Sequence, residues 1–240
     1  PHGVLGLIAL QTDETVENEL RQIFVDPKTA LYVSRVPSAQ VLTPQSIAQM
    51  GRNLPQSARL LPKLDRYHGV GYGCTSGTTL LGSEAVAEMV RAHCAARQVT
   101  NPLGAGIAAL MAVGARRIGL VSPYTADIAQ PVRAAFEEAG FVVDRAVSFG
   151  EADERSVSRI DPNSLSAAAK EVRGAQTDAV FLSCTNLRTL DLIDRLEEAL
   201  GCPVISSNLA LAWHLAQGLP PSAKIAGQGR LFDATQPDGS

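Results

Sequence analysis

The stretches GYGCTSGTTLLG (residues 71–82) and FLSCTNLRTLDLI (residues 181–193) repeat one local pattern. In each, an apolar run ends in Cys-Thr, a Ser or an Asn follows, and a helical pattern begins. Cys74 and Cys184 hold the equivalent positions, 110 residues apart. An apolar run that ends in a small polar turn before a helical pattern is typical of a buried strand followed by a helix. The repetition therefore predicts two similar halves, each with one cysteine at a strand end.

Short β-rich runs alternate with amphipathic helical segments along the whole chain. The predicted strands cover residues 4–10, 31–36, 69–73, 97–101, 117–122, 142–149, 178–184 and 203–208. The predicted helices cover residues 46–64, 82–96, 102–112, 128–139, 162–174, 187–200 and 209–217. Strands that alternate with helices are typical of βαβ units and parallel sheets. The predicted fold class is therefore α/β.

The eight strands divide into two sets of four with matching landmarks, which predicts two pseudo-symmetric Rossmann-like lobes. Each lobe should contain a four-stranded parallel sheet flanked by helices. We expect an N-terminal lobe over residues 1–113, a C-terminal lobe over residues 114–219, and a tail over residues 220–240 that packs back on the N-terminal lobe. Ligands of open α/β sheets bind at the carboxyl ends of the strands. Both cysteines should therefore lie in one cleft between the lobes, which is the expected active site.

Composition argues against several classes of protein. The 240 residues carry a net charge of −3, only 5% are aromatic, and Lys and Arg are scattered. A nucleic acid would therefore find no basic stripe for its phosphates and few aromatic side chains for its bases to stack on, which argues against a nucleic-acid-binding protein. No apolar run approaches the ~20 residues that span a bilayer, and no signal peptide is evident, so we expect a cytoplasmic protein without a membrane partner. We expect no metal, because no C-x-x-C pair and no His/Cys ligand spacing is present. The composition does not decide whether the protein forms homo-oligomers.

The four cysteines fall into two groups. Cys94, within a helical pattern, and Cys202, before a proline, are expected to be small buried hydrophobic residues. Cys74 and Cys184 are the candidate catalytic residues, because the start of a helix should lower the pKa of at least one of these thiols. Two facing thiols suit a reaction without a cofactor. One removes a proton or adds to carbon, and the other delivers a proton on the opposite face.

The candidate substrate-binding residues are polar side chains near strand ends and helix starts. Hydroxyl, amide and backbone donors next to the cysteines could hold a carboxylate or an enolate. The full set is Gln11, Thr12, Thr75, Ser76, Tyr124, Thr185, Asn186, Asn101 and Asn208. Tyr124 could instead be a packing residue, and the last two asparagines could simply be helix N-caps.

The acidic residues Asp13, Glu14 and Glu17 follow the first predicted strand. A carboxylate in this position could be catalytic. We expect these side chains to cap and solvate the first helix instead, because acids beside a carboxylate substrate would repel it.

Four stretches of the chain resemble a known group of enzymes. They are GYGCTSGTTLLG, ARRIGLVSPYTADI (115–128), FLSCTNLRTLDLIDRLEEALGCPVISSN (181–208) and AGQGRLF (226–232). They resemble the aspartate/glutamate racemase superfamily, in the branch that contains maleate cis-trans isomerase and arylmalonate decarboxylase. The resemblance implies a cofactor-independent isomerase or racemase that acts on a small carboxylic acid or dicarboxylate. In its maleate isomerase form, it implies that Cys74 adds to the double bond and that Cys184 handles the proton.

The same resemblance implies a carboxylate cradle formed by Thr75, Ser76, Tyr124, Thr185 and Asn186. It also leaves alternatives. Arylmalonate decarboxylases carry glycine at the position of Cys74, which argues against that activity here. Maleate isomerases carry a substrate-binding Asn in the loop that here reads Gln-Thr-Asp-Glu (11–14), and ectoine-utilisation proteins of the same branch are a further possibility. A non-enzymatic small-acid binder and a thiol–disulfide exchange protein are the other readings.

Overall fold

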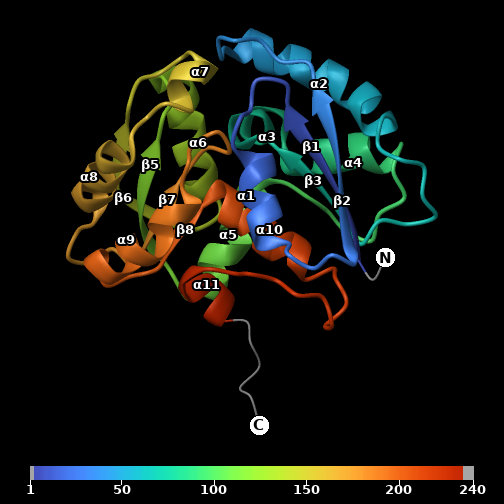
Figure 1. Cartoon of the computed structure of the whole chain (residues 1–240). Coiled ribbons are helices and arrows are strands. Elements are labelled where there is room, and N and C mark those ends of the chain that lie inside the picture. Colours follow the sequence, from blue (N-terminus) through green and yellow to red (C-terminus); the bar gives the residue numbers. More distant parts are fainter. Residues whose placement is uncertain (1–2, 235–240) are drawn as a thin grey trace.

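Two four-stranded parallel sheets form the centre of the protein in a computed structural model that describes residues 3–234 (Figure 1). The first sheet has the order β2 (Thr29–Val36), β1 (Gly3–Leu10), β3 (Gly69–Gly73), β4 (Val99–Thr100). The second has the order β6 (Val142–Ser148), β5 (Arg117–Ser122), β7 (Ala179–Leu182), β8 (Val204–Ser206). The strand order is the same in both sheets, so the predicted two-lobe α/β fold is confirmed.

Helices flank both sheets, which explains why the central strands are apolar on both faces. In the first half they are α1 (Val16–Ile23), α2 (Pro44–Arg59), α3 (Thr75–Leu81), α4 (Ser83–Arg91) and α5 (Pro102–Ala112). In the second half they are α6 (Ala126–Glu138), α7 (Glu154–Val157), α8 (Pro162–Val172), the 3₁₀ turn η1 (Leu190–Leu192), α9 (Ile193–Leu200), α10 (Ser207–Ala216) and α11 (Gly229–Asp233).

Two predicted helices have different bounds in the structure. The helix expected over residues 82–96 is preceded by a separate helix, α3, and the two are divided at Gly82, whose φ of 89° is a conformation that glycine adopts without strain. The helix expected over residues 187–200 begins only at Ile193, because residues 185–189 form turns and η1 follows. Both differences lie directly after a cysteine, where polar turn residues interrupt the helical periodicity.

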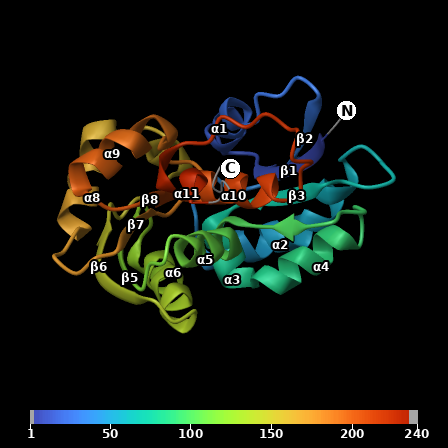
Figure 2. The ribbon, with the colours of Figure 1, turned by 90° about the horizontal axis from the view of Figure 1, so that it is seen from below.

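The helices that follow the fourth strands are exchanged between the lobes. α5 follows β4 of the first sheet, yet its Gly106 lies against Phe181 of β7, where an added Cβ would come within 2.8 Å of the ring. α10 follows β8 of the second sheet, yet its Leu211 lies against Gly71 of β3. The two helices pack against each other between the lobes (Figures 1 and 2). The division near residue 113 thus separates the strands but not the helices that cover them.

Two loops meet above the strand ends and join the lobes there. Val41, in the loop after β2, forms an antiparallel bridge with Asp153, in the loop after β6. The N–H of Leu42 donates to the carbonyl of Ala152 at 3.0 Å, and the N–H of Glu154 donates to the carbonyl of Gln40 at 3.0 Å. In Figure 1, α7 and the start of α2 accordingly lie next to each other.

The segment after α10 touches both lobes. The N–H of Ala226 donates to the carbonyl of Ile23 at 2.8 Å, at the end of α1. α11 then lies on α9, where the N–H of Arg230 donates to Glu197 at 2.9 Å. Residues 235–240 of the expected tail lie outside the described residues.

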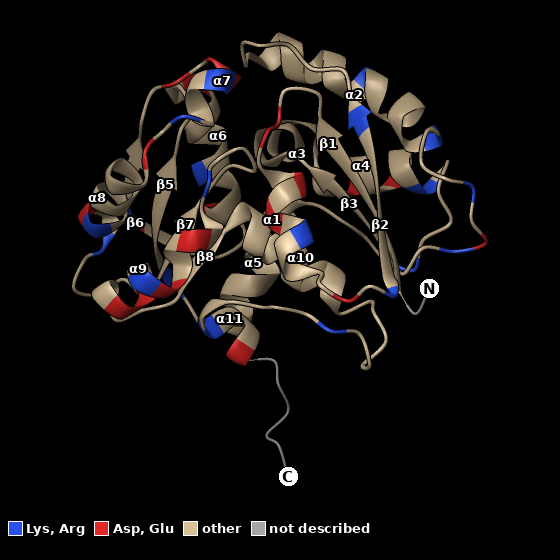
Figure 3. Ribbon diagram, in the orientation of Figure 1, with Lys and Arg blue, Asp and Glu red and all other residues tan. Residues whose placement is uncertain are grey.

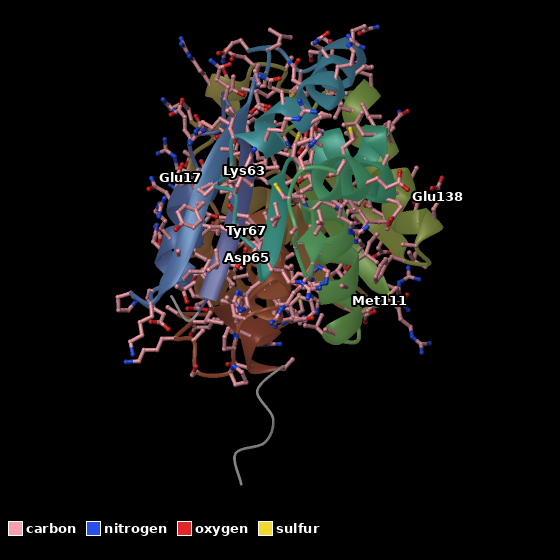
Figure 4. All side chains as sticks on the ribbon, turned by 90° about the vertical axis from the view of Figure 1, so that its right-hand side faces the viewer. Glu17, Lys63, Asp65, Tyr67, Met111 and Glu138 are labelled. Carbon is pink, nitrogen blue, oxygen red and sulfur yellow. The ribbon has the colours of Figure 1, made fainter. Side chains whose placement is uncertain are left out.

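The surface carries charges of both signs on both lobes (Figure 3). Figure 4 places Met111, near the end of α5, on the side of the molecule away from β2, and this side chain is exposed. No helix within residues 3–234 combines the length and the apolar character needed to cross a bilayer.

Candidate active site

Cys74 lies directly after β3 and caps the N-terminus of α3. Its Sγ accepts a hydrogen bond of 3.1 Å from the N–H of Gly77, and the hydroxyl of Ser76 lies 3.6 Å from the sulfur. The side chain is 3% exposed. The sequence correctly placed this thiol at a strand-to-helix junction, where unpaired backbone donors are available.

Cys184 lies two residues after β7, in a different local setting. The N–H of Asn186 donates to its Sγ at 3.4 Å, and the side chain is buried. No helix starts at this cysteine, because the chain makes turns before η1. The expectation that both cysteines open a helix is therefore wrong for Cys184.

The expectation of a depressed thiol pKa is also wrong. Burial raises the pKa of Cys74 to about 12 and that of Cys184 well above its usual value, and the negative charge of Glu154 raises both further. The N–H donors and the neighbouring hydroxyls of Ser76 and Tyr124 lower the two pKa values, but they do not offset the desolvation. Both residues are therefore protonated thiols at neutral pH in this structure. All four cysteines of the chain are unbridged.

The two cysteine segments meet across the lobe boundary. The hydroxyl of Thr185 donates to the carbonyl of Gly73 at 3.3 Å, and each of these residues adjoins one of the two cysteines. Tyr124, which is fully buried, lies at the same place, because both thiols act on the pKa of its phenol. The hydroxyls of Thr75 and Ser207 are 2.9 Å apart and make a second link between the lobes.

Asn186 is fully engaged in holding loops together, although the sequence suggested a free substrate donor. Its Oδ1 accepts a hydrogen bond of 2.9 Å from the N–H of Glu14. Its Nδ2 donates to the backbone carbonyl and to Oε2 of Glu154, both at 2.9 Å. Its own carbonyl accepts from the hydroxyl of Thr15 at 3.0 Å. The amide thus connects the Cys184 segment with the loop after β1 and with α7.

Asn101 is the N-cap of α5, whereas Asn208 is the second residue of α10, whose N-cap is Ser206. Oδ1 of Asn101 accepts from the N–H of Gly104 at 2.8 Å, which is an N-cap of α5. Nδ2 of Asn208 donates to the carbonyl of Thr185 and to Glu19, both at 2.8 Å. Asn101 is therefore a cap, and Asn208 is a support for the Cys184 segment.

Gln11 and Thr12 lie in the loop that follows β1. They line a cavity of about 430 Å³ together with Glu14, Ser38, Gln40 and Arg155. A second cavity, of about 290 Å³, lies between α1 and the segment around Arg188, and Glu14 lines it as well. Neither cavity is lined by a cysteine. Glu14 is exposed as expected, and it forms an ion pair of 2.8 Å with Arg159 of the other lobe.

Three carboxylates in the surroundings of the site, Asp13, Glu19 and Glu154, are buried, and the sequence did not reveal their burial. Asp13 caps α1 as expected, because its Oδ1 accepts from the N–H groups of Thr15 and Val16 at 2.8 Å, but it is only 3% exposed and not solvated. Glu19 accepts four hydrogen bonds from three residues that surround it, and Glu154 is 2% exposed.

Glu154 is the residue near the two cysteines that the sequence most clearly failed to indicate. It stands in the polar stretch GEADERS (150–156), where residue order does not distinguish it from its neighbours. Burial raises its pKa to about 7. Within the described part of the chain, no three His, Cys, Asp or Glu side chains are arranged to hold a metal ion.

The chain is similar to two groups of known proteins. Maleate isomerase from Nocardia farcinica is 26% identical over 251 residues, which cover 95% of this chain and 94% of that protein. The chain also resembles a solved structure of Nocardia farcinica maleate cis-trans isomerase, a Cys-to-Ser mutant with a covalently bound succinylcysteine intermediate. The two structures superimpose with a TM-score of 0.81 at 25% identity, over 96% of this chain and 98% of that one.

A second group of relatives lies closer in sequence over a shorter span. Arylmalonate decarboxylase from Bordetella bronchiseptica is 34% identical over 127 residues, which cover 52% of this chain and 53% of that protein. The model of the arylmalonate decarboxylase family matches residues 83–232, well over half of the chain. On that match, and with two equivalent lobes that meet at paired strand ends, the chain belongs to the arylmalonate decarboxylase family.

Proposed function

We propose that this chain is a cofactor-independent isomerase of a small carboxylic acid, with Cys74 and Cys184 as its catalytic residues. The observation that carries the proposal is their placement. Each lobe puts one buried cysteine at the carboxyl end of the equivalent strand, β3 or β7, and a hydrogen bond joins the two segments. The likeness to maleate isomerases over nearly the whole chain supports the same activity class.

For an unsaturated diacid, cis–trans isomerisation by the two thiols needs no further reactant. The thiolate of Cys74 adds to one alkene carbon, and the electron pair of the double bond moves toward the adjacent carboxylate to form an enediolate. The thiol of Cys184 protonates the second carbon, and the new single bond rotates. The thiolate of Cys184 then removes the proton again, the C–S bond breaks, and the trans isomer leaves. The succinylcysteine in the Nocardia farcinica enzyme is an adduct of this kind.

The raised thiol pKa values place a condition on this step. The sulfur of Cys74 is desolvated in this structure, so we propose that the loops above the strand ends separate, water enters with the substrate, and the thiol releases its proton to that water to form the thiolate. The N–H of Gly77 and the hydroxyl of Ser76 already point at this sulfur and would stabilise its charge. We place the substrate carboxylate near the hydroxyls of Ser76 and Tyr124, because these two hydroxyls lie at the cysteine sulfurs, whereas Thr75, Thr185 and Asn186 are held by other groups of the protein.

Decarboxylation is the second candidate, because the family model and the 34% identical relative both carry that activity in their names. Only Cys184 would be needed for this reaction, as the proton donor to an enediolate left by loss of CO₂. The presence of Cys74 favours the isomerase.

The test is a set of NMR assays in D₂O. Wild-type protein, Cys74→Ser and Cys184→Ser are incubated with unsaturated diacids, with chiral 2-substituted acids and with phenylmalonate. Formation of an isomer, or deuterium incorporation, that disappears in both variants supports the proposal. Release of CO₂ from phenylmalonate that persists in Cys74→Gly supports the decarboxylase. Undiminished isomerisation in the Cys74→Ala/Cys184→Ala double variant would overturn the role of the thiols.

A further inference from the structure

Tyr72 and Cys74 lie on the same face of the first sheet. Successive side chains of a strand point to opposite faces, and the backbone of Cys74 is still extended, with φ −155° and ψ 111°. Gly71 lies on the face that α10 covers, because a Cβ added there would come 3.2 Å from Leu211. Tyr72 and Cys74, one and three residues later, therefore both point to the opposite face.

The phenol hydroxyl of Tyr72 reaches the surroundings of the Cys74 sulfur. Both atoms border Gly77, the residue whose N–H donates to the sulfur at 3.1 Å. A Cβ added to Gly77 would lie 2.7 Å from the phenol oxygen and 2.8 Å from the sulfur. Glycine at this position therefore leaves the space that the oxygen and the sulfur share.

This hydroxyl is an unused hydrogen-bond donor. Tyr72 is fully buried, yet its hydroxyl has no hydrogen-bond partner among residues 3–234. Buried tyrosine hydroxyls usually find a partner, because a desolvated donor without an acceptor is unfavourable. A phenylalanine would fill the same space without this penalty. The unused donor therefore points to an acceptor that arises during the reaction, and the thiolate of Cys74 is an acceptor of this kind.

The charges around the sulfur show why a further donor matters. Burial raises the pKa of Cys74 to about 12, and the negative charge of Glu154 in the second lobe raises it further. The hydroxyl of Ser76, the N–H of Gly77 and the hydroxyl of Tyr72 lower this pKa. Hydrogen bonds to the charged form of a group favour that form, so each of these donors makes the thiolate easier to form.

Tyr72 is suited to donate a proton in a hydrogen bond and not to accept one from the thiol. Burial, and after it the charge of Cys74, raise the pKa of its phenol well above the usual value, so the hydroxyl stays protonated. The proton that leaves the thiol goes to water. The second buried phenol at this place, Tyr124, responds to both Cys184 and Cys74, whereas Cys74 is the thiol that affects Tyr72.

We propose that Tyr72 is a positioning residue whose hydroxyl donates a hydrogen bond to the thiolate of Cys74 and stabilises it. The inference rests on the proposed function, in which this thiolate adds to the substrate. Tyr72 acts through the sulfur and not on the substrate itself. Both residues belong to one strand end of the first lobe, so the contact persists when the loops above the strand ends separate.

The test compares the alkylation of Cys74 and Cys184 by iodoacetamide in ligand-free wild-type protein and in Tyr72→Phe, between pH 7 and pH 9. A hydrogen bond to an ionised group is strong enough to shift a pKa by about one to two units. Because a more basic thiolate is also more nucleophilic, Tyr72→Phe should slow alkylation of Cys74 by about three- to tenfold. The rate at Cys184 should be unchanged. Thermal unfolding should show equal or greater stability, because the lost hydroxyl had no partner.

Tyr67→Phe is the matched control. Tyr67 is buried in the same lobe, but its hydroxyl donates to the carbonyl of Pro62 at 2.6 Å. This variant should therefore lose stability and keep the wild-type alkylation rate of Cys74, which is the reverse of the result expected for Tyr72→Phe.

An unchanged rate at Cys74 in Tyr72→Phe, or an equal loss of rate at both cysteines, would overturn the role of Tyr72. Alkylation needs no substrate, so this result is independent of turnover. A wild-type protein that isomerises none of the acids offered would contradict the proposed function, and the alkylation rates would still decide whether Tyr72 stabilises the thiolate.

Discussion

The hydroxyl of Thr185 in the second lobe donates a hydrogen bond of 3.3 Å to the carbonyl of Gly73 in the first lobe. Thr185 immediately follows Cys184, and Gly73 immediately precedes Cys74. Any movement that separates the lobes at this point therefore moves Cys74 and Cys184 apart. The geometry of the thiol pair is thus coupled to the lobe interface and to the two loops that close over it.

The Cys74→Ser and Cys184→Ser variants should differ in whether they form a covalent adduct with the substrate. We expect Cys74→Ser and Cys184→Ser each to lower turnover by at least about a hundredfold, because a hydroxyl cannot replace a thiolate base or nucleophile. Cys184→Ser should still accumulate an adduct on Cys74 with an unsaturated diacid, visible by intact mass, whereas Cys74→Ser should not. An adduct in Cys74→Ser and none in Cys184→Ser would reverse the assigned roles.

Alkylation of the two thiols in the ligand-free protein should depend steeply on pH. Because burial raises both pKa values, the thiolate fraction is small at pH 7 and grows about tenfold per pH unit up to pH 9. Iodoacetamide labelling, followed by mass spectrometry of the peptides that contain Cys74 and Cys184, measures this slope. Free cysteine provides the comparison, since its rate levels off near its pKa of about 8.5. A plateau at or below pH 8 for either protein thiol would show a depressed pKa.

Glu154→Gln should stabilise the ligand-free protein, and more so at high pH. The folded-state pKa of Glu154 is about 7, above its ordinary value of 4.5, so the folded protein binds more protons between these values and loses stability as the pH rises through them. The neutral amide removes this loss. Chemical denaturation should show a gain in the free energy of unfolding that is about 2 kcal/mol larger at pH 8 than at pH 5.5.

The same substitution at Glu19 should have the opposite effect. Both oxygens of this carboxylate accept hydrogen bonds, and an amide nitrogen would face the donors of Asn208 or of the 189–190 backbone. We expect Glu19→Gln to lower the free energy of unfolding by about 1–3 kcal/mol at pH 8. If both variants shift stability in the same direction, Glu154 is a structural carboxylate like Glu19 and not an uncompensated charge.

The exchange of helices between the lobes can be tested on α5 alone. Gly106→Ala would place its Cβ within 2.8 Å of the Phe181 ring, so it should destabilise the protein by about 1–3 kcal/mol. Gly104→Ala on the same helix meets only an ordinary contact of 3.4 Å with Asn101, and should be neutral or stabilising by up to about 1 kcal/mol. If thermal and chemical unfolding show the same change in stability for Gly106→Ala and Gly104→Ala, α5 does not pack closely on the second sheet.

The sequence alone determined the repeat, the strands and the placement of both cysteines after the third strand of each set. These features are local, because apolar runs, polar turns and helix periodicity are properties of short segments. The same local reasoning identified Asn101 as a possible N-cap and Asp13 as a cap of the first helix. It failed at Cys184, where a helical pattern was read through a turn.

Only the tertiary structure decided which charges are buried and which helix covers which sheet. Asp13 and Glu154 look like solvated acids in sequence, and they lose water only because two lobes and two loops close over them. The thiol pKa values follow the same rule, since desolvation by the assembled lobes outweighs the donors that local structure supplies. The exchange of α5 and α10 likewise depends on where two apolar faces meet, which no segment of the chain specifies by itself.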